Sequence, residues 1–266
     1  MARIHQKPVH RLSRRLLNWF RSRVFKGVGK SQDAYFVTIN GHRYKRVVFG
    51  DSRQAAAVAS ALEDYRQCVG LPELVLSEEN EIWVRFVEGR KPDPEQASDW
   101  QALNDFFAAL YATDHYQVDL DSTSLHQQLL IDLTFLRDCG IFDAEQHERL
   151  ADRAEQLKPE QIWLGADYVD PVLKNFVVNE RGLFVIDIES LQSGVMLGTG
   201  VAKSSLHWLG RDSQAFFDRL VGQKGVPDLR PQKDYVELSF LSGWTKRKLL
   251  TGKWSRVQTR RFERFF

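Results

Sequence analysis

Three polar residues stand at the outer ends of two short apolar runs in the second half of the chain. Asp170 and Asn175 come just before or at the start of the first run, and Asp187 comes directly after the second. Residues 179–182 between the runs are turn-forming, so the pattern predicts a hairpin. Because a hairpin brings its outer ends together, the three polar groups are expected at one mouth. Two carboxylates and an amide there suit a hard cation with oxygen ligands, and Mg²⁺ on nucleotide phosphates is the usual occupant of such a set.

The residues around this predicted hairpin read Tyr168-Val-Asp170-Pro-Val-Leu-Lys-Asn175 and then Leu183-Phe-Val-Ile-Asp187-Ile-Glu189. They resemble the catalytic core of aminoglycoside phosphotransferases and their kinase-like relatives, which has the pattern H-x-D-x-x-x-x-N, a short hairpin, and I-D-x-E. The resemblance implies that Asp170 orients the substrate hydroxyl and accepts its proton, and that Asn175 and Asp187 hold Mg²⁺. Tyr168 stands where the family pattern has His. The resemblance implies that the residue at this position supports the catalytic loop structurally. Taken singly, each polar residue also has an ordinary explanation in a turn, a cap or a strand end.

The first part of the chain resembles the nucleotide-binding lobe of the same family. Gly27 and Gly29 precede a predicted strand pair and resemble the glycine-containing loop that covers the phosphates of ATP. The resemblance implies that Lys45, on the second strand of the pair, reaches these phosphates, and that Glu63, on the next helix, pairs with Lys45.

The assignments of Lys45 and Glu63 leave alternatives open. Arg46 and Lys30 compete with Lys45 for the phosphates. Lys45 could instead be an outward-facing strand residue, and Glu63 could be an ordinary solvated glutamate of a helix.

The pattern along the chain predicts an α+β class, a two-lobed kinase-like fold. The predicted strands are 34–39, 42–49 (joined by Asn40-Gly41), 73–76 and 82–87, and the predicted helices are 53–68, 98–111, 124–138 and 144–157, with helical periodicity again near 203–222. The runs 85–91 and 110–114 resemble the hinge and a helix end of the same phosphotransferases. The predicted segments are a basic amphipathic N-terminal segment (1–26), a nucleotide-binding N-lobe (27–90), a catalytic C-lobe (91–243) and a basic aromatic tail (244–266).

Composition is that of a folded globular protein. The chain has 266 residues, of which 43% are hydrophobic, and its two cysteines, Cys68 and Cys139, match no metal-ligand spacing. No run approaches the roughly 18 apolar residues of a membrane-spanning helix. No apolar region follows the basic N-terminus, so a secretory signal is not expected. We therefore expect a cytoplasmic protein with reduced cysteines.

Charge is distributed unevenly. Residues 1–30 carry nine Lys and Arg and no acid, and 245–266 carry eight against one acid, whereas 31–244 have a net charge of −14. Both ends also contain large aromatic residues. Such segments could lie on an anionic membrane surface, dock on the acidic body, or bind nucleic acid. The acidic body would repel a long polyanion, which makes nucleic acid an unlikely partner.

The expected activity is transfer of the γ-phosphoryl group of ATP, with Mg²⁺, to a hydroxyl group. Asp187 is followed by Ile-Glu and not by Phe-Gly, and this favours a small molecule or glycan over a protein side chain as acceptor. The basic, aromatic ends extend this expectation to a membrane-associated glycolipid, like the substrates of lipopolysaccharide core sugar kinases, on the inner face of the membrane. Two alternatives stay open: a pseudokinase without turnover, and a peripheral membrane adaptor.

Overall fold

The computed structural model describes residues 4–8, 33–253 and 259–266. The chain divides into two compact units: unit 1 comprises Met1–Phe106 and Val172–Gln192, and unit 2 comprises Phe107–Pro171 and Ser193–Phe266. Unit 1 extends beyond the lobe boundary predicted near residue 90, and it also includes the second predicted hairpin. The amphipathic helix predicted for 11–25, together with Gly27 and Gly29, lies outside the described residues.

Unit 1 contains a five-stranded antiparallel sheet in the order β1-β2-β3-β5-β4. Its strands are β1 (Ile4–Pro8), β2 (Asp33–Ile39), β3 (His42–Val48), β4 (Leu74–Glu78) and β5 (Glu81–Arg85). Asn40 and Gly41 join β2 to β3 with φ angles of 51° and 82°, which is the left-handed pair that a tight hairpin favours. The predicted Asn-Gly hairpin is therefore confirmed, whereas β1 was not predicted.

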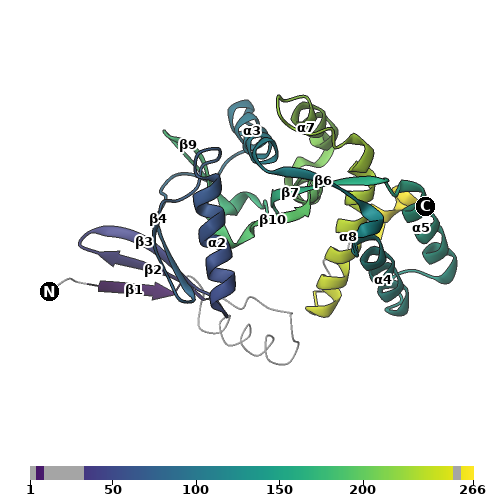
Figure 1. The fold of residues 1–266 in the computed structure, drawn as a ribbon, viewed down its shortest axis with the longest axis horizontal. Helices are drawn as coiled ribbons and strands as arrows, with labels where there is room; N and C mark the ends of the chain where they lie inside the picture. Colours follow the sequence, from purple (N-terminus) through teal and green to yellow (C-terminus); the bar gives the residue numbers. More distant parts are fainter. Residues whose placement is uncertain (1–3, 9–32, 254–258) are drawn as a thin grey trace. The chain divides into compact units, whose positions relative to one another are not determined.

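Helix α2 (Ser52–Tyr65) covers one part of this sheet (Figure 1). The side chain of Asp51 caps the helix by accepting a hydrogen bond from the Gln54 backbone N–H over 3.0 Å. The buried residues of the helix and the sheet form one cluster with Ile188: Val47, Phe49, Ala55, Val58, Leu62, Ile82 and Val84. The strand β3 is thus anchored to α2 and to the segment after the second hairpin.

The second predicted hairpin is present in unit 1 as β8 (Phe176–Asn179) and β9 (Gly182–Val185). The backbones of Arg90 and Val178 exchange two hydrogen bonds of 3.0 and 2.8 Å. Gly89 allows this approach, because a Cβ there would lie 2.4 Å from the Val178 carbonyl oxygen and φ at Gly89 is +157°. Gly70 allows a similarly close approach to β9, because a Cβ at Gly70 would lie 1.9 Å from the Leu183 carbonyl oxygen.

Arg90 also forms an ion pair with Asp99, whose side chain is only 3% exposed, and the guanidinium holds the pKa of this carboxyl below its usual range. Asp99 belongs to α3 (Ala97–Thr113). The run after β5 is therefore fixed both to the hairpin and to the start of α3.

Unit 2 combines a small sheet with helices. The sheet has the order β10-β7-β6, with β6 (His115–Asp119), β7 (Gln161–Tyr168) and β10 (Leu191–Met196). The helices are α4 (Leu125–Asp138), α5 (Ala144–Leu157), α6 (Thr199–Ser204), a π turn (Ser205–Leu209), α7 (Ser213–Val221) and α8 (Lys233–Leu250), followed by a 3₁₀ helix (Thr259–Phe265). Helices α4 and α5 agree with the predicted ranges, whereas this sheet and α8 were not predicted.

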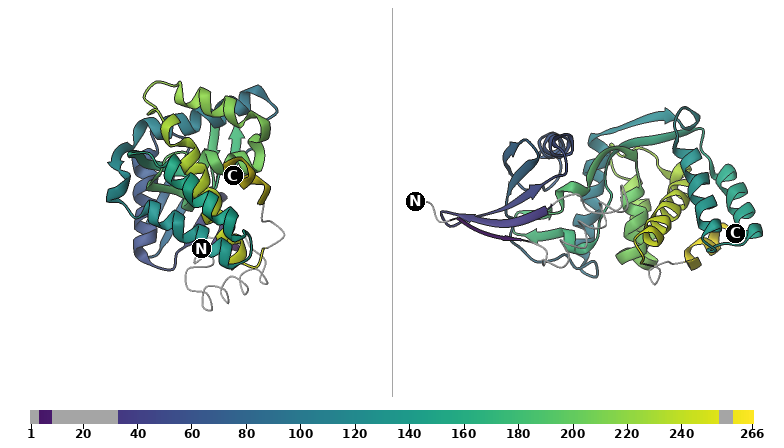
Figure 2. Two further views of the ribbon diagram at one scale, coloured as in Figure 1. Left: turned by 90° about the vertical axis from the view of Figure 1, so that its right-hand side faces the viewer. Right: turned by 90° about the horizontal axis from the view of Figure 1, so that it is seen from below.

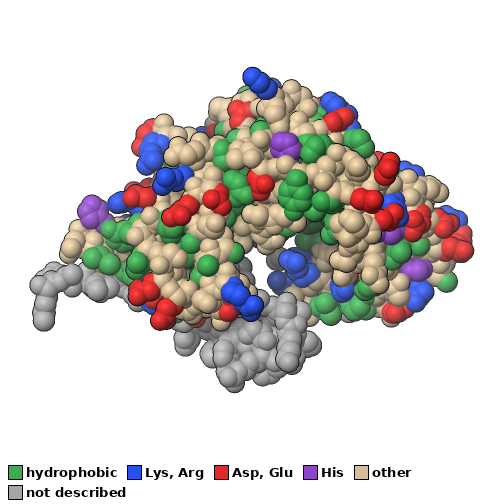
Figure 3. Space-filling model, in the orientation of Figure 1, with side chains coloured by type: hydrophobic (Ala, Val, Ile, Leu, Met, Phe, Trp, Pro, Cys, Tyr) green, Lys and Arg blue, Asp and Glu red, His purple; other side chains and the backbone are tan. Residues whose placement is uncertain are grey.

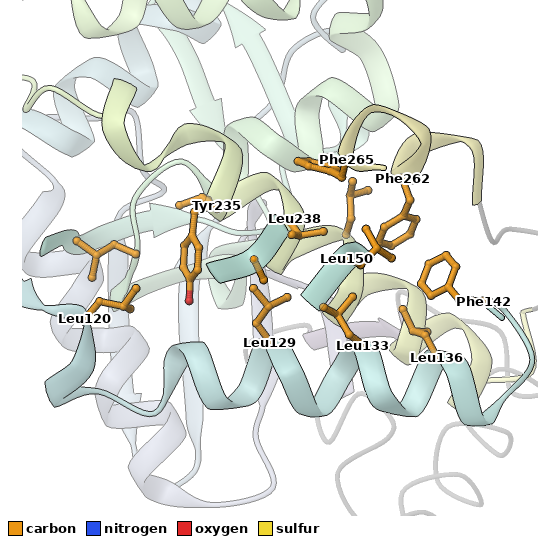
Figure 4. Packing of buried hydrophobic residues seen from close by; sticks show 14 of the residues in the cluster. Leu120, Leu129, Leu133, Leu136, Phe142, Leu150, Tyr235, Leu238, Phe262 and Phe265 are labelled. Carbon is orange, nitrogen blue, oxygen red and sulfur yellow. The ribbon is translucent and has the colours of Figure 1, made fainter. Parts of the chain in front are cut away.

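The main core of unit 2 lies between α4, α5 and α8, which run side by side in Figures 1 and 2. Figure 4 shows leucines of α4 pointing toward Tyr235 and Leu238 of α8. Phe262 and Phe265 of the C-terminal 3₁₀ helix complete this core, and the rings of Phe142 and Phe262 are 4.9 Å apart.

Three large aromatic residues of the C-terminal segment are buried in unit 2, whereas Phe266 is exposed. Trp244, Phe262 and Phe265 are 8%, 0% and 4% exposed. Lys246 forms an ion pair with Asp132 at 2.6 Å. For these residues the structure agrees with the docked alternative and not with an aromatic face turned toward a membrane.

Over α4 and α5, acidic and basic side chains are interspersed on the face drawn in Figure 3. Ion pairs such as Arg137–Asp138 on α4 account for part of this pattern. Within the described ranges, no helix has the length and hydrophobicity that crossing a membrane requires.

Candidate active site

Asn175 and Asp187 lie together at the mouth of the β8–β9 hairpin. Asn175 ends a 3₁₀ turn just before β8, and Asp187 follows β9. The Asn175 side-chain N–H donates to Asp187 Oδ2 over 3.3 Å, and the Ser190 hydroxyl donates to the same oxygen over 3.0 Å. The backbone N–H of Ile186 donates to the Asn175 carbonyl oxygen over 2.9 Å. An amide and a carboxylate are thus held side by side, because the hairpin register fixes both.

Lys45 projects from β3 toward the same carboxylate. Its Nζ donates to the Ile186 carbonyl oxygen over 2.7 Å and lies 3.5 Å from Glu189 Oε2 and 3.9 Å from Asp187 Oδ1. The Lys45, Asp187 and Glu189 side chains are 13%, 16% and 10% exposed, so their charges are weakly screened. Arg46, the next residue on the strand, forms an ion pair with Glu81 instead. Lys30 lies outside the described residues. The structure thus brings Lys45 to Asp187.

Glu63 is not beside Lys45. It is exposed on α2, because the helix turns Leu62 and Tyr65 toward the core and leaves Glu63 on the solvent side. Among the described residues, the ion pairs of Lys45 are with Asp187 and Glu189. The pairing expected for Glu63 is therefore made by Glu189, the last residue of the I-D-x-E motif.

Asp170 lies in the loop after β7, in unit 2. Its carboxylate forms an ion pair with Lys203 of α6, and Lys203 Nζ also donates to the Val169 carbonyl oxygen over 3.3 Å. The Trp208 indole N–H donates to the Pro171 carbonyl oxygen over 2.7 Å. Asp170 is 34% exposed and Lys203 is 14% exposed. The loop is thus anchored on both sides of Asp170, while the carboxylate itself keeps access to solvent.

Asp167 anchors the base of this loop from inside unit 2. Its two carboxylate oxygens accept hydrogen bonds from the backbone N–H groups of Tyr168 (2.7 Å) and Gly200 (2.9 Å). Full burial raises the pKa of Asp167 to about 6, although these bonds and one with the Tyr111 side chain oppose the rise. A Cβ at Gly200 would lie 2.4 Å from the Tyr168 carbonyl oxygen, so only glycine fits between α6 and the loop.

Comparison with known proteins bears on the whole architecture. No protein-family model and no curated protein matches the chain. Solved structures match over nearly its whole length. A thermostable mutant of aminoglycoside phosphotransferase APH(4)-Ia superposes with a TM-score of 0.62 and 15% identity, covering 98% of this chain and 93% of that chain. Ethanolamine kinase from Plasmodium vivax gives 0.58 and 9%, covering 98% and 80%, and choline kinase LicA from Streptococcus pneumoniae gives 0.56 and 11%, covering 95% and 97%.

The chain has a protein-kinase-like fold. The predicted two-lobed α+β class is thereby confirmed. The structural neighbours are aminoglycoside and macrolide phosphotransferases and choline and ethanolamine kinases. A further structure of the APH(4)-Ia protein is a ternary complex with ADP and hygromycin B.

The kinase-like hairpin fits Mg²⁺ by the chemistry of its donor set. Mg²⁺ at nucleotide sites takes one or two protein oxygens and fills its other positions with phosphate oxygens and water. The Asn175 amide oxygen and the Asp187 carboxylate are such a pair, and the Asn175 side-chain N–H donates to Asp187 Oδ2 over 3.3 Å. Among the described residues no cluster of three His, Cys, Asp or Glu side chains forms a self-contained metal site. A nucleotide-dependent Mg²⁺ site needs none.

Sequence reasoning missed three residues that contact the predicted site residues or hold their loop: Glu189, Lys203 and Asp167. Glu189 stood inside the recognised motif but received no role, and Lys203 carried no local signal. Asp167 was detectable in principle, because an acid within the apolar run 162–168 indicates a buried carboxylate.

Proposed function

We propose that this protein is a phosphotransferase that uses ATP and Mg²⁺ to phosphorylate a hydroxyl of a small molecule or glycan. The observation that carries the proposal is the set of Asn175, Asp187 and Lys45 on the hairpin and on β3 of a kinase-like fold. Phosphoryl transfer requires little covalent chemistry from the protein, so positioning and charge stabilisation suffice.

Each residue has a role in this proposal. Asn175 and Asp187 hold Mg²⁺, which when bound neutralises charge on the nucleotide phosphates. Lys45 exchanges its contact with Asp187 for a phosphate oxygen, and Glu189 retains the ammonium in place. Asp170 orients the acceptor hydroxyl and accepts its proton.

Lys203 is a positioning residue that supports Asp170 in this role. Its ion pair with Asp170 holds that carboxylate in place, and its bond to the Val169 carbonyl oxygen fixes the loop. Tyr168, at the family's His position, is fully buried, in keeping with a structural role.

A glycolipid acceptor at the inner face of a membrane is the finer form of the proposal. Its support comes from the basic residues of the N-terminal segment, because the described aromatic residues of the C-terminal segment, except the half-exposed Phe266, pack in the core. A pseudokinase is the second candidate. It is favoured by the engagement of both Asp170 and Asp187 with the protein's own lysines.

The test is transfer of label from γ-labelled ATP to pooled hydroxyl acceptors, comprising free sugars, aminoglycosides, choline and lipopolysaccharide core glycans. Labelled product with the wild-type chain, and none with Asp170→Asn, supports an enzyme. Tight Mg²⁺-dependent nucleotide binding without any labelled product would instead support the pseudokinase.

A further inference from the structure

A hollow of about 260 Å³ lies within unit 2, between the end of α6, the start of α7, α8 and the C-terminal 3₁₀ helix. Four basic side chains line it: Arg211, Lys233, Arg261 and Arg264. They come from three segments that are separated in the sequence: the turn Gly210–Asp212, helix α8 and the C-terminal 3₁₀ helix, which supplies both Arg261 and Arg264. Their convergence is therefore a product of the fold and not of one basic run.

The lining carries an excess of positive charge. Its carboxylate is that of Glu237, which lies 3.6 Å from Lys233 Nζ and forms an ion pair with Arg264. Asp234, outside the lining, is 3.8 Å from Arg264. Even with Asp234 and with Asp218, whose charge acts on Lys233, included, four cations face three carboxylates. Glu237 thus orients two of the cations without neutralising the group.

Lys233 shows that this charge is held in a partly dry place. Its side chain is 21% exposed, and its Nζ lies 5.4 Å above the Phe217 ring and donates to Gln214 Oε1 over 3.0 Å. Burial lowers the pKa of Lys233, and the nearby charge of Arg264 acts in the same direction. An anion in the hollow would relieve both effects.

Ser205, Ser213 and Gln214 also line the hollow, but their side chains already donate to the Val201 carbonyl oxygen, the Gly210 carbonyl oxygen and Asp218 Oδ1, respectively. The cations are therefore the groups that would bind a phosphate. Guanidinium groups bind phosphate oxygens with paired, charge-assisted hydrogen bonds. The volume is slightly below the roughly 300–1,000 Å³ of drug-sized ligand sites, as suits a small ligand.

We propose that this hollow binds the phosphate group of a small phosphomonoester. The site is separate from the Asp170 carboxylate, but both adjoin α6: Lys203 contacts Asp170, whereas Ala202, on another face of the same helix, lines the hollow. The proposal does not depend on the proposed phosphotransferase activity.

Calorimetric titration of the full chain with glucose 6-phosphate, and with glucose as the uncharged control, tests this site. The expected result is saturable binding of glucose 6-phosphate and none of glucose. Arg211→Gln and Lys233→Gln should each weaken binding tenfold or more. Lys224→Gln, an exposed position beyond α7 with the same charge change, should leave it unaltered. Arg211 is exposed, so its variant should keep the wild-type melting temperature even if Lys233→Gln does not.

Two further arms separate the source of the phosphate and the two sites. Sedimentation with phosphatidic acid vesicles, against phosphatidylcholine vesicles, detects a lipid headgroup. Arg211-dependent binding to these vesicles alone would support the site with a lipid as its source. Binding of glucose 6-phosphate should persist in Asp187→Asn, so a failed nucleotide site leaves this result intact. Absence of binding to both phosphate probes, or equal weakening by Lys224→Gln, would overturn the proposal.

Discussion

The two acidic centres, around Asp187 in unit 1 and around Asp170 in unit 2, are built differently. Asp187 is surrounded mainly by residues of its own motif, with Asn175, Ser190 and Glu189 all within 12 positions, plus Lys45 from β3. Asp170 is held by Lys203 of α6, and its loop by Trp208, residues 33 and 38 positions away, respectively. A local hairpin can be predicted from a sequence, whereas a contact made by a helix remote in the sequence cannot.

The largest expected effect is on the turnover number and comes from Asp170, the proposed proton acceptor. Asp170→Asn should lower the turnover number by about 10²–10⁴-fold, because it removes proton acceptance from the acceptor hydroxyl. The affinity for Mg²⁺–ATP should change little, since the nucleotide contacts belong to the Asp187 centre. Steady-state and single-turnover kinetics at saturating ATP measure both quantities. Lost nucleotide affinity with a normal rate at saturation would reverse the assigned roles of the two centres.

The buried anchor of the Asp170 loop should appear in the pH dependence of stability. The pKa of Asp167 is about 6 in the folded protein, above the 3.8 of the free group, so the folded state holds the proton more tightly. Its contribution to stability is therefore full below pH 4 and is lost as the pH rises through 6, by on the order of 3 kcal/mol.

Urea denaturation of wild type and Asp167→Asn at several pH values between 4 and 7 measures this effect. The difference in unfolding free energy between the two proteins should fall from pH 4 to pH 7. The carboxylates shared by both, including Asp99, cancel in that difference. A difference that is constant with pH would remove Asp167 from the account.

Lys203 gives a test of the remote anchor with a matched variant. Lys203→Met should lower the turnover number by roughly tenfold and leave the affinity for Mg²⁺–ATP unchanged, because Asp170 loses the ion pair that holds its carboxylate in place. Lys203→Arg should recover most of the rate. If Lys203→Met changes only the melting temperature and leaves the turnover number intact, Lys203 is a structural residue.

The smallest effect separates Glu189 from Glu63. Glu189→Gln should weaken ATP binding several-fold, because Lys45 then loses a carboxylate at 3.5 Å. Glu63→Gln, the same chemical change on the exposed face of α2, should leave ATP affinity at the wild-type value. Equal effects from both variants would show that Lys45 takes a partner in α2 when nucleotide binds.

The sequence was sufficient for elements that carry their own signals. The Asn40-Gly41 turn, the capped α2 and the amphipathic α4 and α5 all follow from residues near one another in the chain. The sheet β10-β7-β6 does not follow from nearby residues. Paired residues of β6 and β7 lie 40 or more positions apart, and β10 has an irregular, glycine-containing sequence.

The site was predictable to the same extent. Asn175 and Asp187 were expected together on the basis of hairpin geometry, and they lie together. The resemblance implies a pairing of Glu63 with Lys45, but the direction of a helix side chain depends on which face of the helix packs on the core, and here Leu62 packs there and Glu63 is exposed. The C-terminal cations and aromatic residues left three alternatives open, and the sequence did not distinguish docking, in which Phe262 and Phe265 fill the unit 2 core, from a membrane surface.

The central claim is that Asn175 and Asp187 hold Mg²⁺ for a nucleotide. Its most direct test is calorimetric titration of the full chain with a non-hydrolysable ATP analogue, with and without Mg²⁺, for wild type, Asp187→Asn and Glu180→Gln. Glu180 lies in the exposed turn of the same hairpin and controls for charge removal. The account predicts that Mg²⁺ strengthens binding for wild type and Glu180→Gln and has no effect for Asp187→Asn, with all three melting alike. Equal Mg²⁺ enhancement in Asp187→Asn would contradict it.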